Sequence, residues 1–342
     1  MCKSIMFDQA KRVYRAALEA IRRLDEISKQ KKAYREVFHQ DAVGLRNKLK
    51  EYCERLMFYN PSDYGRKAEE VLWRKVFYEI IQLMKHNRKH IRMGSSLEAA
   101  FRTHLSSATG YYYHLSFRLQ QEFGLKLYGI LDFNLVPEQK TVIRKLGLQN
   151  SVKKRDFSSA VQSWAMSACH RCLVCLGDIA RYQQDFDKGL SKSSAERFYY
   201  QAITLFPENG MPHNQLGTLS GSRFYNVEAA YYYIRCLVCD KPFEGADGNL
   251  QRLFEKNNKR LAEIQHNLSL PPEVQRVYDT KMFLIQFLQL VGVFHATDKQ
   301  LKPSDIQEKC QIKDWLTQNN RIMCQSRVTC LSVDCCFSEL AL

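Results

Sequence analysis

The chain has 342 residues, and its 45% hydrophobic content excludes wholesale disorder. Its 15 Gly and 8 Pro are few for an all-β protein, no apolar run reaches the ~18 residues of a membrane span, and the first residues lack the apolar core of a secretory signal. The net charge of +15 predicts polyanionic partners, such as RNA, acidic proteins or phosphorylated segments, without distinguishing among them.

Apolar residues three and four positions apart predict amphipathic helices along the first half of the chain. The predicted ranges are 8–35, 41–59, about 62–90 and 96–123. Pro61 should end the second helix, and Ser62 or Asp63 should cap the third. Gly124 should stop the fourth helix, and we expect a long connection over 124–157.

From Ser158 onward the sequence contains a repeat with the period of tetratricopeptide (TPR) helical hairpins. The positions that recur at this period are Ala195 and Ala229, Tyr199 and Tyr233, and Ala202 and Cys236. Leu176-Gly177 returns as Leu216-Gly217 at a longer interval, which extra loop residues around 186–191 would explain. Because small residues let two helices approach closely, we expect TPR-type hairpins over about 158–242. Further helices are predicted over about 243–267, 272–296 and 303–325.

Twelve cysteines in a chain without an export signal are typical of reduced thiols in the cytosol or nucleus. Cys169, Cys172 and Cys175 form C-x2-C-x2-C, a spacing that permits a metal or iron–sulfur site. They lie within a predicted helix that offers no loop to wrap an ion, so we expect buried core thiols, and the same applies to Cys335 and Cys336. We predict no metal and no cofactor.

The sequence lacks the motifs of common enzyme sites. It has no nucleophile elbow, P-loop or H-E-x-x-H, and its carboxylates are scattered over helix surfaces. We therefore expect a non-enzymatic protein.

The segment GDIARY, residues 177–182, places an arginine and a tyrosine on an otherwise apolar helix. One interpretation is an i,i+3 ion pair between Asp178 and Arg181 on a wet surface. The other is a phosphate site in which Arg181 and Tyr182 donate hydrogen bonds. The residues of this segment leave both interpretations open.

A polar stripe is predicted on the helix over about 62–90. Its members follow at steps of three, four and three, and they are Lys75, Tyr78, Gln82 and Lys85. The two lysines would stand ~15 Å apart along the helix axis. Such a stripe is usually a solvated face, so it predicts a site only together with other signals.

The segment GDIARY resembles the helix of 14-3-3 proteins in which G-D-x-x-R-Y supplies an Arg and a Tyr to a phosphoserine. Asn214, in PHNQLG, and Asn249, in GNLQRLF, resemble two asparagines of that family. There they hydrogen-bond the main chain of an extended peptide. The resemblance implies a phosphopeptide site containing Arg181, Tyr182, Asn214 and Asn249.

A longer resemblance covers about residues 65–260, including AERFYYQAITLFPENGMPHNQLGTL and FEGADGNLQRLF. These segments are similar to the 14-3-3-like domain of the nonsense-mediated mRNA decay adaptors, the Smg-five, Smg-six and Smg-seven group, and to the Smg-five type in particular. The resemblance implies an all-α fold: a 14-3-3-like antiparallel array over 1–267, with TPR-type hairpins, and a helical extension over 268–342.

The same resemblance implies partners and a location. The partners are a Smg-seven-like protein in a heterodimer, the phosphorylated Upf-one helicase and protein phosphatase machinery. The location is cytoplasmic with nuclear shuttling, and no membrane partner is expected.

The chain departs from the 14-3-3 phosphate pocket at one position. That pocket has a Lys on the third helix and an Arg seven residues later, and here Tyr78 and Lys85 occupy the two places. Lys75, one turn before Tyr78, is the candidate to replace the missing charge. Loss of one charge-assisted contact of ~1.5–3 kcal/mol weakens phosphate binding about ten- to a hundredfold or more.

Gly110 stands inside a predicted helix, where it costs ~0.5–1 kcal/mol relative to Ala. Close approach of a partner is one explanation, with neighbouring tyrosines such as Tyr112 as interface anchors. A kink or tight internal packing is the other. The implied heterodimer favours the partner.

Three alternatives to phosphopeptide binding remain. A basic RNA-binding module would show steep salt dependence and little dependence on Arg181. A purely structural heterodimer subunit would keep the Gly110 face and tolerate Arg181→Glu. An enzyme would need convergent carboxylates or a nucleophile–base pair.

Overall fold

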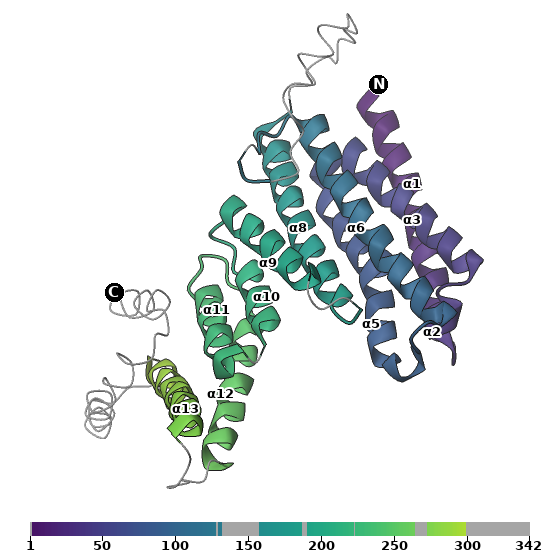
Figure 1. Ribbon diagram of the computed structural model, residues 1–342. Helices are drawn as coiled ribbons and strands as arrows, with labels where there is room; N and C mark the ends of the chain where they lie inside the picture. The colour runs from purple at the N-terminus through teal and green to yellow at the C-terminus, as the bar shows by residue number, and fades with distance from the viewer. Residues whose placement is uncertain are drawn as a thin grey trace, which may run out of the picture. The chain divides into compact units, whose positions relative to one another are not determined.

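The computed structural model describes residues 2–127, 129–131, 157–186, 190–221, 223–263 and 272–298, and the regular elements in these ranges are helices (Figure 1). This confirms the predicted all-α class. The chain divides into two compact units, Met1–Phe206 and Pro207–Leu342, which we call the first and second units. The predicted helix at 303–325, Cys335 and Cys336 lie outside the described residues, and the predicted division at 267/268 stays a prediction.

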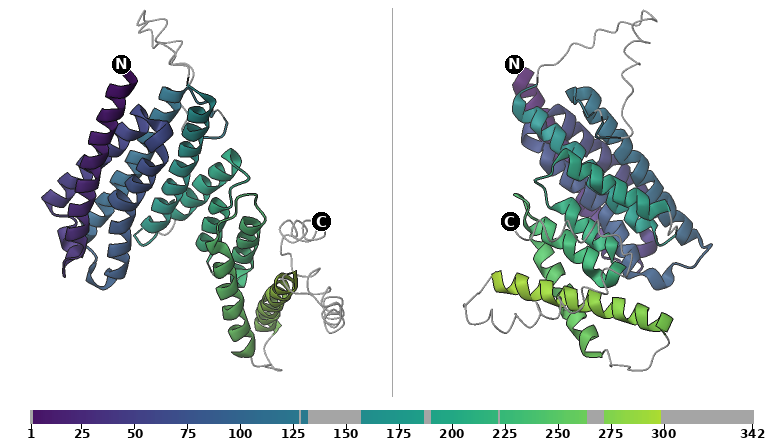
Figure 2. Two further views of the ribbon diagram at one scale, coloured as in Figure 1. Left: turned by 180° about the vertical axis from the view of Figure 1, so that it is seen from behind. Right: turned by 60° about the vertical axis from the view of Figure 1, so that its left-hand side comes forward.

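The first unit is an array of long helices packed side by side, and they run in alternating directions, with α4 and α5 as parts of one continuous helix (Figures 1 and 2). Its helices are α1 (Cys2–Ser28), α2 (Ala33–Glu36), α3 (Gln40–Tyr59), α4 (Arg66–Val71), α5 (Glu79–His86), α6 (Ser96–Phe123), α8 (Ser159–Gln183) and α9 (Leu190–Leu205). Their apolar faces form one core, which includes Leu49, Met57, Ile81, Leu105, Leu119 and Leu173.

Local capping explains where the helices begin and end. Ser95 accepts a hydrogen bond from the backbone N–H of Glu98, and Gly124 adopts φ +64° after α6, so the predicted limits 96–123 are confirmed. The predicted cap at Ser62 or Asp63 is wrong, because the side chain of Asn60 accepts from the N–H of Asp63.

The prediction of one helix over 8–35 is also wrong. α1 ends at Ser28, and the short α2 follows at Ala33–Glu36. The intervening turn contains three lysines in a row of polar residues, which gives the helix no apolar face to continue.

The helix that carries the predicted polar stripe is not regular. Between α4 and α5, Leu72–Tyr78 form a π-helical segment, whose i→i+5 turns are wider than α-helical turns. The extra residue per turn changes which side chains share a face. The stripe was predicted from α-helical spacing through this segment, and that spacing does not hold between Lys75 and Lys85.

The second unit contains α10 (Met211–Ser220), α11 (Val227–Leu237), α12 (Gly245–Glu263) and α13 (Pro272–Asp298). Asn257 of α12, fully buried, donates to the carbonyl of Ile285 in α13 over 2.8 Å. By length and composition alone, Val274–His295 would suffice to cross a membrane, with 17% of its most apolar window buried. One such helix is weak evidence for a membrane span, and α13 packs against α12.

The repeat corresponds to two helical hairpins, α8–α9 in the first unit and α10–α11 in the second. A Cβ atom on Gly177 would lie 2.3 Å from the ring of Tyr199, and one on Gly217 would lie 2.6 Å from the ring of Tyr233. Each glycine therefore lets a tyrosine of the facing helix pack against the backbone. This is the close approach that the repeat predicted; the assignment to the TPR class stays a prediction.

Candidate functional site

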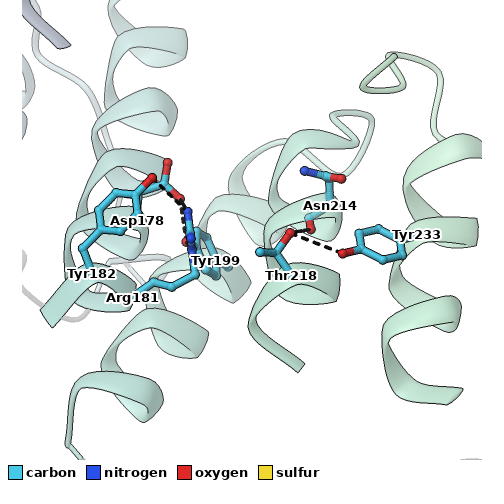
Figure 3. A network of polar contacts seen from close by, with 7 residues as sticks. All are labelled: Asp178, Arg181, Tyr182, Tyr199, Asn214, Thr218 and Tyr233. Atoms are coloured by element: carbon cyan, nitrogen blue, oxygen red, sulfur yellow. Dashed lines mark hydrogen bonds and ion pairs between the residues drawn. The ribbon is translucent and has the colours of Figure 1, made fainter. Parts of the chain in front are cut away.

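Arg181 lies on the last turns of α8 within a network of polar side chains, which Figure 3 shows. Its Nη2 donates to Asp178 Oδ1 over 3.1 Å and to the hydroxyl of Tyr182 over 3.3 Å. Its Nε donates to the hydroxyl of Tyr199 on α9 over 3.4 Å, and that hydroxyl donates to Asp178 over 2.7 Å.

The ion pair expected between Asp178 and Arg181 is therefore present, but it is not on a wet surface. The side chains of Arg181 and Asp178 are only 16% and 10% exposed. Burying an ion pair costs solvation energy, which hydrogen bonds to both partners offset here. The two interpretations of GDIARY are thus compatible: the arginine is held in place by a carboxylate.

The surroundings keep Arg181 charged and Tyr182 neutral. Burial alone would lower the pKa of Arg181, but Asp178, followed by Tyr199 and Tyr182, raises it above the ordinary value. Burial raises the pKa of Tyr182 to about 12. At neutral pH, Tyr182 therefore keeps its O–H and can donate a hydrogen bond to an anion.

Lys85, in the last turn of α5, joins this group from a neighbouring helix. Its Nζ lies 5.1 Å from the ring centre of Tyr182, and the guanidinium of Arg181 lies 4.6 Å from the same ring centre. Burial and then the positive charge of Arg181 lower the pKa of Lys85. We call Lys85, Asp178, Arg181, Tyr182 and Tyr199 the Arg181 cluster.

The structure does not bring Lys75 to this cluster. Its Nζ lies 2.7 Å from Asp25 on α1 and 2.6 Å from Glu79, and its side chain is 12% exposed. Two carboxylates therefore already balance its charge. These two ion pairs compete with the predicted role of Lys75 in compensating for Tyr78.

Tyr78 does lie beside the Arg181 cluster. It packs on Trp73, with ring centres 5.8 Å apart, and it contributes to the raised pKa of Tyr182. An aromatic side chain therefore stands next to Tyr182 where the resemblance implied that a lysine belongs. The charges available for an anion in this cluster are Arg181 and Lys85.

The two predicted asparagines lie together in the second unit. Asn249 of α12 donates to the side-chain oxygen of Asn214 over 2.9 Å and accepts from Arg252 over 2.5 Å. The main-chain carbonyl of Asn214 accepts from Thr218, whose hydroxyl lies 3.4 Å from that of Tyr233 (Figure 3). Sequence reasoning missed Arg252, although its position three residues after Asn249 on one helix was a usable signal.

Asp178 and Tyr199 are the other members that sequence reasoning did not place in the site. Asp178 was considered only as a surface partner of Arg181, and Tyr199 only as a repeat position. The repeat could have identified Tyr199, because it predicts that this residue packs on Gly177. A residue that packs on Gly177 also lies beside the next residue, Asp178.

The predicted interface residues Gly110 and Tyr112 face in different directions. A Cβ atom on Gly110 would meet no described atom within 4 Å, so tight internal packing does not explain this glycine. Tyr112 is 3% exposed and packs against Phe77 and Trp73 in the core of the first unit. The expectation that Tyr112 is an interface anchor is corrected: it stabilises the unit from within.

The cysteine motif lies on α8 and contributes to the core of the first unit. Cys169 and Cys172 are buried, and burial raises the pKa of Cys169 to about 12, which keeps it a thiol. In the described part of the chain, no group of three His, Cys, Asp or Glu side chains is arranged to hold a metal ion. The interpretation of these residues as core thiols fits this burial.

The Arg181 cluster has the chemistry of an oxyanion site. A guanidinium, an ammonium and a neutral phenol come together from two helices, while Asp178 of α8 and Tyr199 of α9 fix the guanidinium. Charge-assisted hydrogen bonds from fixed donors suit a phosphate. No acid–base pair or nucleophile accompanies them in this cluster.

Comparison with known proteins adds two family matches. Residues 67–187 match the family described as telomerase activating protein Est1, and residues 195–319 match the Est1 DNA/RNA binding domain. The first match contains the Arg181 cluster apart from Tyr199, and the second begins within α9.

The chain is also similar to individual proteins. The chain is 46% identical to nonsense-mediated mRNA decay factor SMG5 of Danio rerio over 303 residues, which is 88% of this chain and 27% of the relative. It is 46% identical to SMG5 of Homo sapiens over 88% of this chain and 29% of that protein. With SMG7 of Arabidopsis thaliana it shares 34% identity over 50% of this chain and 15% of the relative. The chain thus spans less than a third of the length of these relatives.

Proposed function

From the premise that this chain belongs to the Est1 family, with SMG5 and SMG7 among its relatives, we propose that it is a non-enzymatic adaptor of nonsense-mediated mRNA decay. Its task is to bind a phosphorylated serine or threonine segment of the Upf-one helicase. The observation that supports this most is the Arg181 cluster, in which a mostly buried guanidinium, an ammonium and a neutral phenol lie together as hydrogen-bond donors for an anion.

In the proposed complex, Arg181 and Lys85 neutralise the phosphate and Tyr182 donates a hydrogen bond to it. Asp178 keeps its contact with the guanidinium and orients it, so part of the entropy cost of ordering Arg181 is already met in the free protein. Asn214 and Asn249 remain the predicted ligands of the peptide main chain. Affinity should be moderate, because Tyr78 takes the place of a cation.

The test is fluorescence anisotropy with a phosphoserine peptide of the Upf-one helicase and its unphosphorylated twin. Lys85→Gln is the first variant, since Lys85 is exposed and its ammonium lies over the face of Tyr182. Arg181→Lys is the second, because it keeps the charge but removes the fork. Each should weaken binding of the phosphopeptide about tenfold and leave the twin unchanged.

Lys48→Gln is the matched control, an exposed lysine on α3 without an ion pair among the described residues. It removes the same charge as Lys85→Gln and should leave binding unchanged. If wild-type protein does not distinguish the phosphopeptide from its twin, phosphate binding by this cluster is wrong.

A second role is proposed for the face of α6 around Gly110, as the contact with a Smg-seven-like subunit. A mid-helix glycine costs ~0.5–1 kcal/mol relative to Ala, and no described neighbour requires it. A partner helix that approaches α6 closely would require a residue without a side chain at this position. Gly110→Glu should abolish heterodimerisation in size-exclusion chromatography with light scattering.

Gly44 in α3 provides the control, because a Cβ there also meets no described atom within 4 Å. Gly44→Glu should leave the heterodimer intact. Equal loss with both variants would show a general effect of added charge and would contradict this interface. Phosphatase machinery, as a further partner, and a cytoplasmic location with nuclear shuttling complete the proposal.

A further inference from the structure

One end of the first unit carries a dense set of exposed cations that belongs neither to the Arg181 cluster nor to the α6 face. They come from two turns, the one between α1 and α3 and the one between α5 and α6 (Figure 1). We call this set the basic end, and its members are Lys29, Lys31, Lys32, Arg35, Arg88, Lys89 and Arg92.

The two turns are joined in space by a pair of rings. Tyr34 of α2 and His90 stack with ring centres 4.7 Å apart and planes 6° from parallel. Arg35 lies 5.7 Å from the centre of the Tyr34 ring. Cations from two distant parts of the sequence therefore form one continuous surface.

Very little negative charge balances this surface. Residues 29–35 and 86–95 contain no Asp or Glu, and the carboxylates that border them are Glu36, next to Arg35, and Glu98, which accepts from the N–H of Gly94 and pairs with Arg102. Arg88 pairs with Asp185 over 3.0 Å, whereas the other six cations make no ion pair with any described residue. Like charges gathered without counter-charges repel each other, and a polyanion relieves that repulsion by displacing condensed counterions.

The chemistry of the two turns favours a nucleic acid over an acidic peptide. An extended peptide needs several amide groups to pair with its main chain, and the two turns contain only Gln30 and Asn87, of which Asn87 is already bonded to the carbonyl of Leu83. The turns offer instead stacked rings, arginines and Met93, which is 97% exposed. Unpaired bases stack on such groups while the cations follow the phosphates.

We propose that the basic end of the first unit binds single-stranded nucleic acid through its sugar-phosphate backbone. This surface precedes residues 195–319, the segment that matches the DNA/RNA binding family, so it is a separate site. It is also distinct from the Arg181 cluster, since none of its cations belongs to that cluster.

The experiment is a fluorescence-anisotropy titration of the full chain with a fluorescein-labelled 15-nucleotide oligo-U RNA, at 50 and 200 mM KCl. Lys31→Glu with Lys32→Glu is the first variant, and Lys89→Glu with Arg92→Glu is the second. Each should weaken binding at 50 mM salt about tenfold or more. Each should also reduce the slope of log K against log salt by about 1.4, the value for two lost phosphate contacts on a single strand.

The matched control reverses two exposed cations on α3, Lys48→Glu with Arg55→Glu, and changes the net charge by the same amount. It should leave affinity within about twofold. Glutamine substitutions at the four test positions provide a second set without charge reversal, should either Glu pair disturb folding.

Three results would overturn the proposal. The first is no binding of the RNA by wild-type protein at 50 mM KCl. The second is equal weakening by the α3 control, which would show attraction to net charge alone. The third is a poly-glutamate peptide of the same length that binds the basic end as tightly as the RNA, which would assign the surface to acidic proteins.

Discussion

The hairpins α8–α9 and α10–α11 use the same backbone contact and differ in the residue that follows it. In the first, Gly177 packs on Tyr199, and the next residue, Asp178, accepts a hydrogen bond from the Tyr199 hydroxyl over 2.7 Å. In the second, Gly217 packs on Tyr233, and the hydroxyl of the next residue, Thr218, lies 3.4 Å from the Tyr233 hydroxyl.

The difference between Asp178 and Thr218 affects the residue one helical turn later. Asp178 holds Arg181, and both are mostly buried. The equivalent position in the second hairpin is Gly221, which adopts φ +52° and follows the end of α10. The glycine–tyrosine contact is therefore the scaffold, and only the first hairpin adds a charge to it. The comparison makes predictions that can be ordered by size.

The largest effect is expected from Gly177→Ala. The new Cβ would lie 2.3 Å from the Tyr199 ring, which is fully buried and also bonded to Asp178 and Arg181, so the ring has no room to move. Overpacking of this kind costs about 3 kcal/mol. Gly217→Ala should cost about 1–2 kcal/mol, because Tyr233 is 8% exposed and less constrained. Urea unfolding followed by circular dichroism measures both.

Gly44→Ala is the reference for these two variants. Its Cβ would meet no described atom, so it should be neutral or stabilise α3 by up to about 1 kcal/mol through helix propensity. If Gly177→Ala were as mild as Gly44→Ala, the close contact that defines the hairpin would be wrong.

The next effect comes from the residue after each glycine. Asp178→Ala leaves the guanidinium of Arg181 without its carboxylate and the Tyr199 hydroxyl without its acceptor, so we expect a loss of about 2–3 kcal/mol in the free energy of unfolding. Thr218→Ala removes weaker, neutral contacts and should cost about 0.5–1 kcal/mol.

Chemical denaturation of the two variants side by side checks this order. The double variant Asp178→Ala with Arg181→Leu should recover part of the loss, because it removes the uncompensated charge. Equal losses for Asp178→Ala and Thr218→Ala would show that the ion pair contributes nothing beyond a hydrogen bond.

A smaller effect distinguishes the hairpins by pH. His213 in α10 occupies the position equivalent to Leu173 in α8, and burial lowers its pKa from 6.5 to about 4. The unfolded chain therefore binds a proton between these two pH values that the folded protein does not. The free energy of unfolding consequently falls as pH decreases from about 6.5 to about 4, by about 1–2 kcal/mol once solvent screening is allowed for.

His213→Leu copies the first hairpin and should remove this acid sensitivity. Thermal unfolding of wild type and variant at pH 7 and pH 5 measures the difference. Part of the acid effect should persist in the variant, because burial also lowers the pKa of His104 in the first unit to about 4. If the pH dependence of the variant matched that of wild type, His213 would not be its source.

The sequence predicted those parts of the fold that depend on local pattern. The limits of α6 followed from Ser95 and Gly124, and the close hairpins followed from Gly177 and Gly217, since caps and glycine–tyrosine contacts leave signals within a few residues. The π-helical segment around Lys75 left no such signal. It depends on the packing of several helices against one another, which a regular α-helical period cannot reveal.

The same limit applies to the site. Arg181, Tyr182 and Lys85 were identified from one motif and one helix, and the structure brings them together. Tyr112 was wrongly predicted to be exposed, because the sequence near a surface glycine is compatible with either an exposed or a buried aromatic residue. Only the packing of the neighbouring helices shows that Tyr112 is buried. Asp178 was identified as a partner of Arg181. Its burial, however, depends on the packing of α9, which the residues next to Asp178 in the sequence do not determine.

A small stability effect is expected for Asn249→Ala, about 1 kcal/mol, since it removes the hydrogen bond to Asn214 and the exposed one from Arg252. The Asn249→Ala variant is more informative in peptide-binding experiments. A ligand of the peptide main chain contributes equally to a phosphorylated peptide and to its unphosphorylated twin, whereas a phosphate ligand contributes only to the first. Anisotropy titrations with both peptides should therefore show equal weakening for Asn249→Ala and selective weakening for Arg181→Lys. Selective loss with Asn249→Ala would instead assign that asparagine to the phosphate and leave the main chain without its predicted ligand.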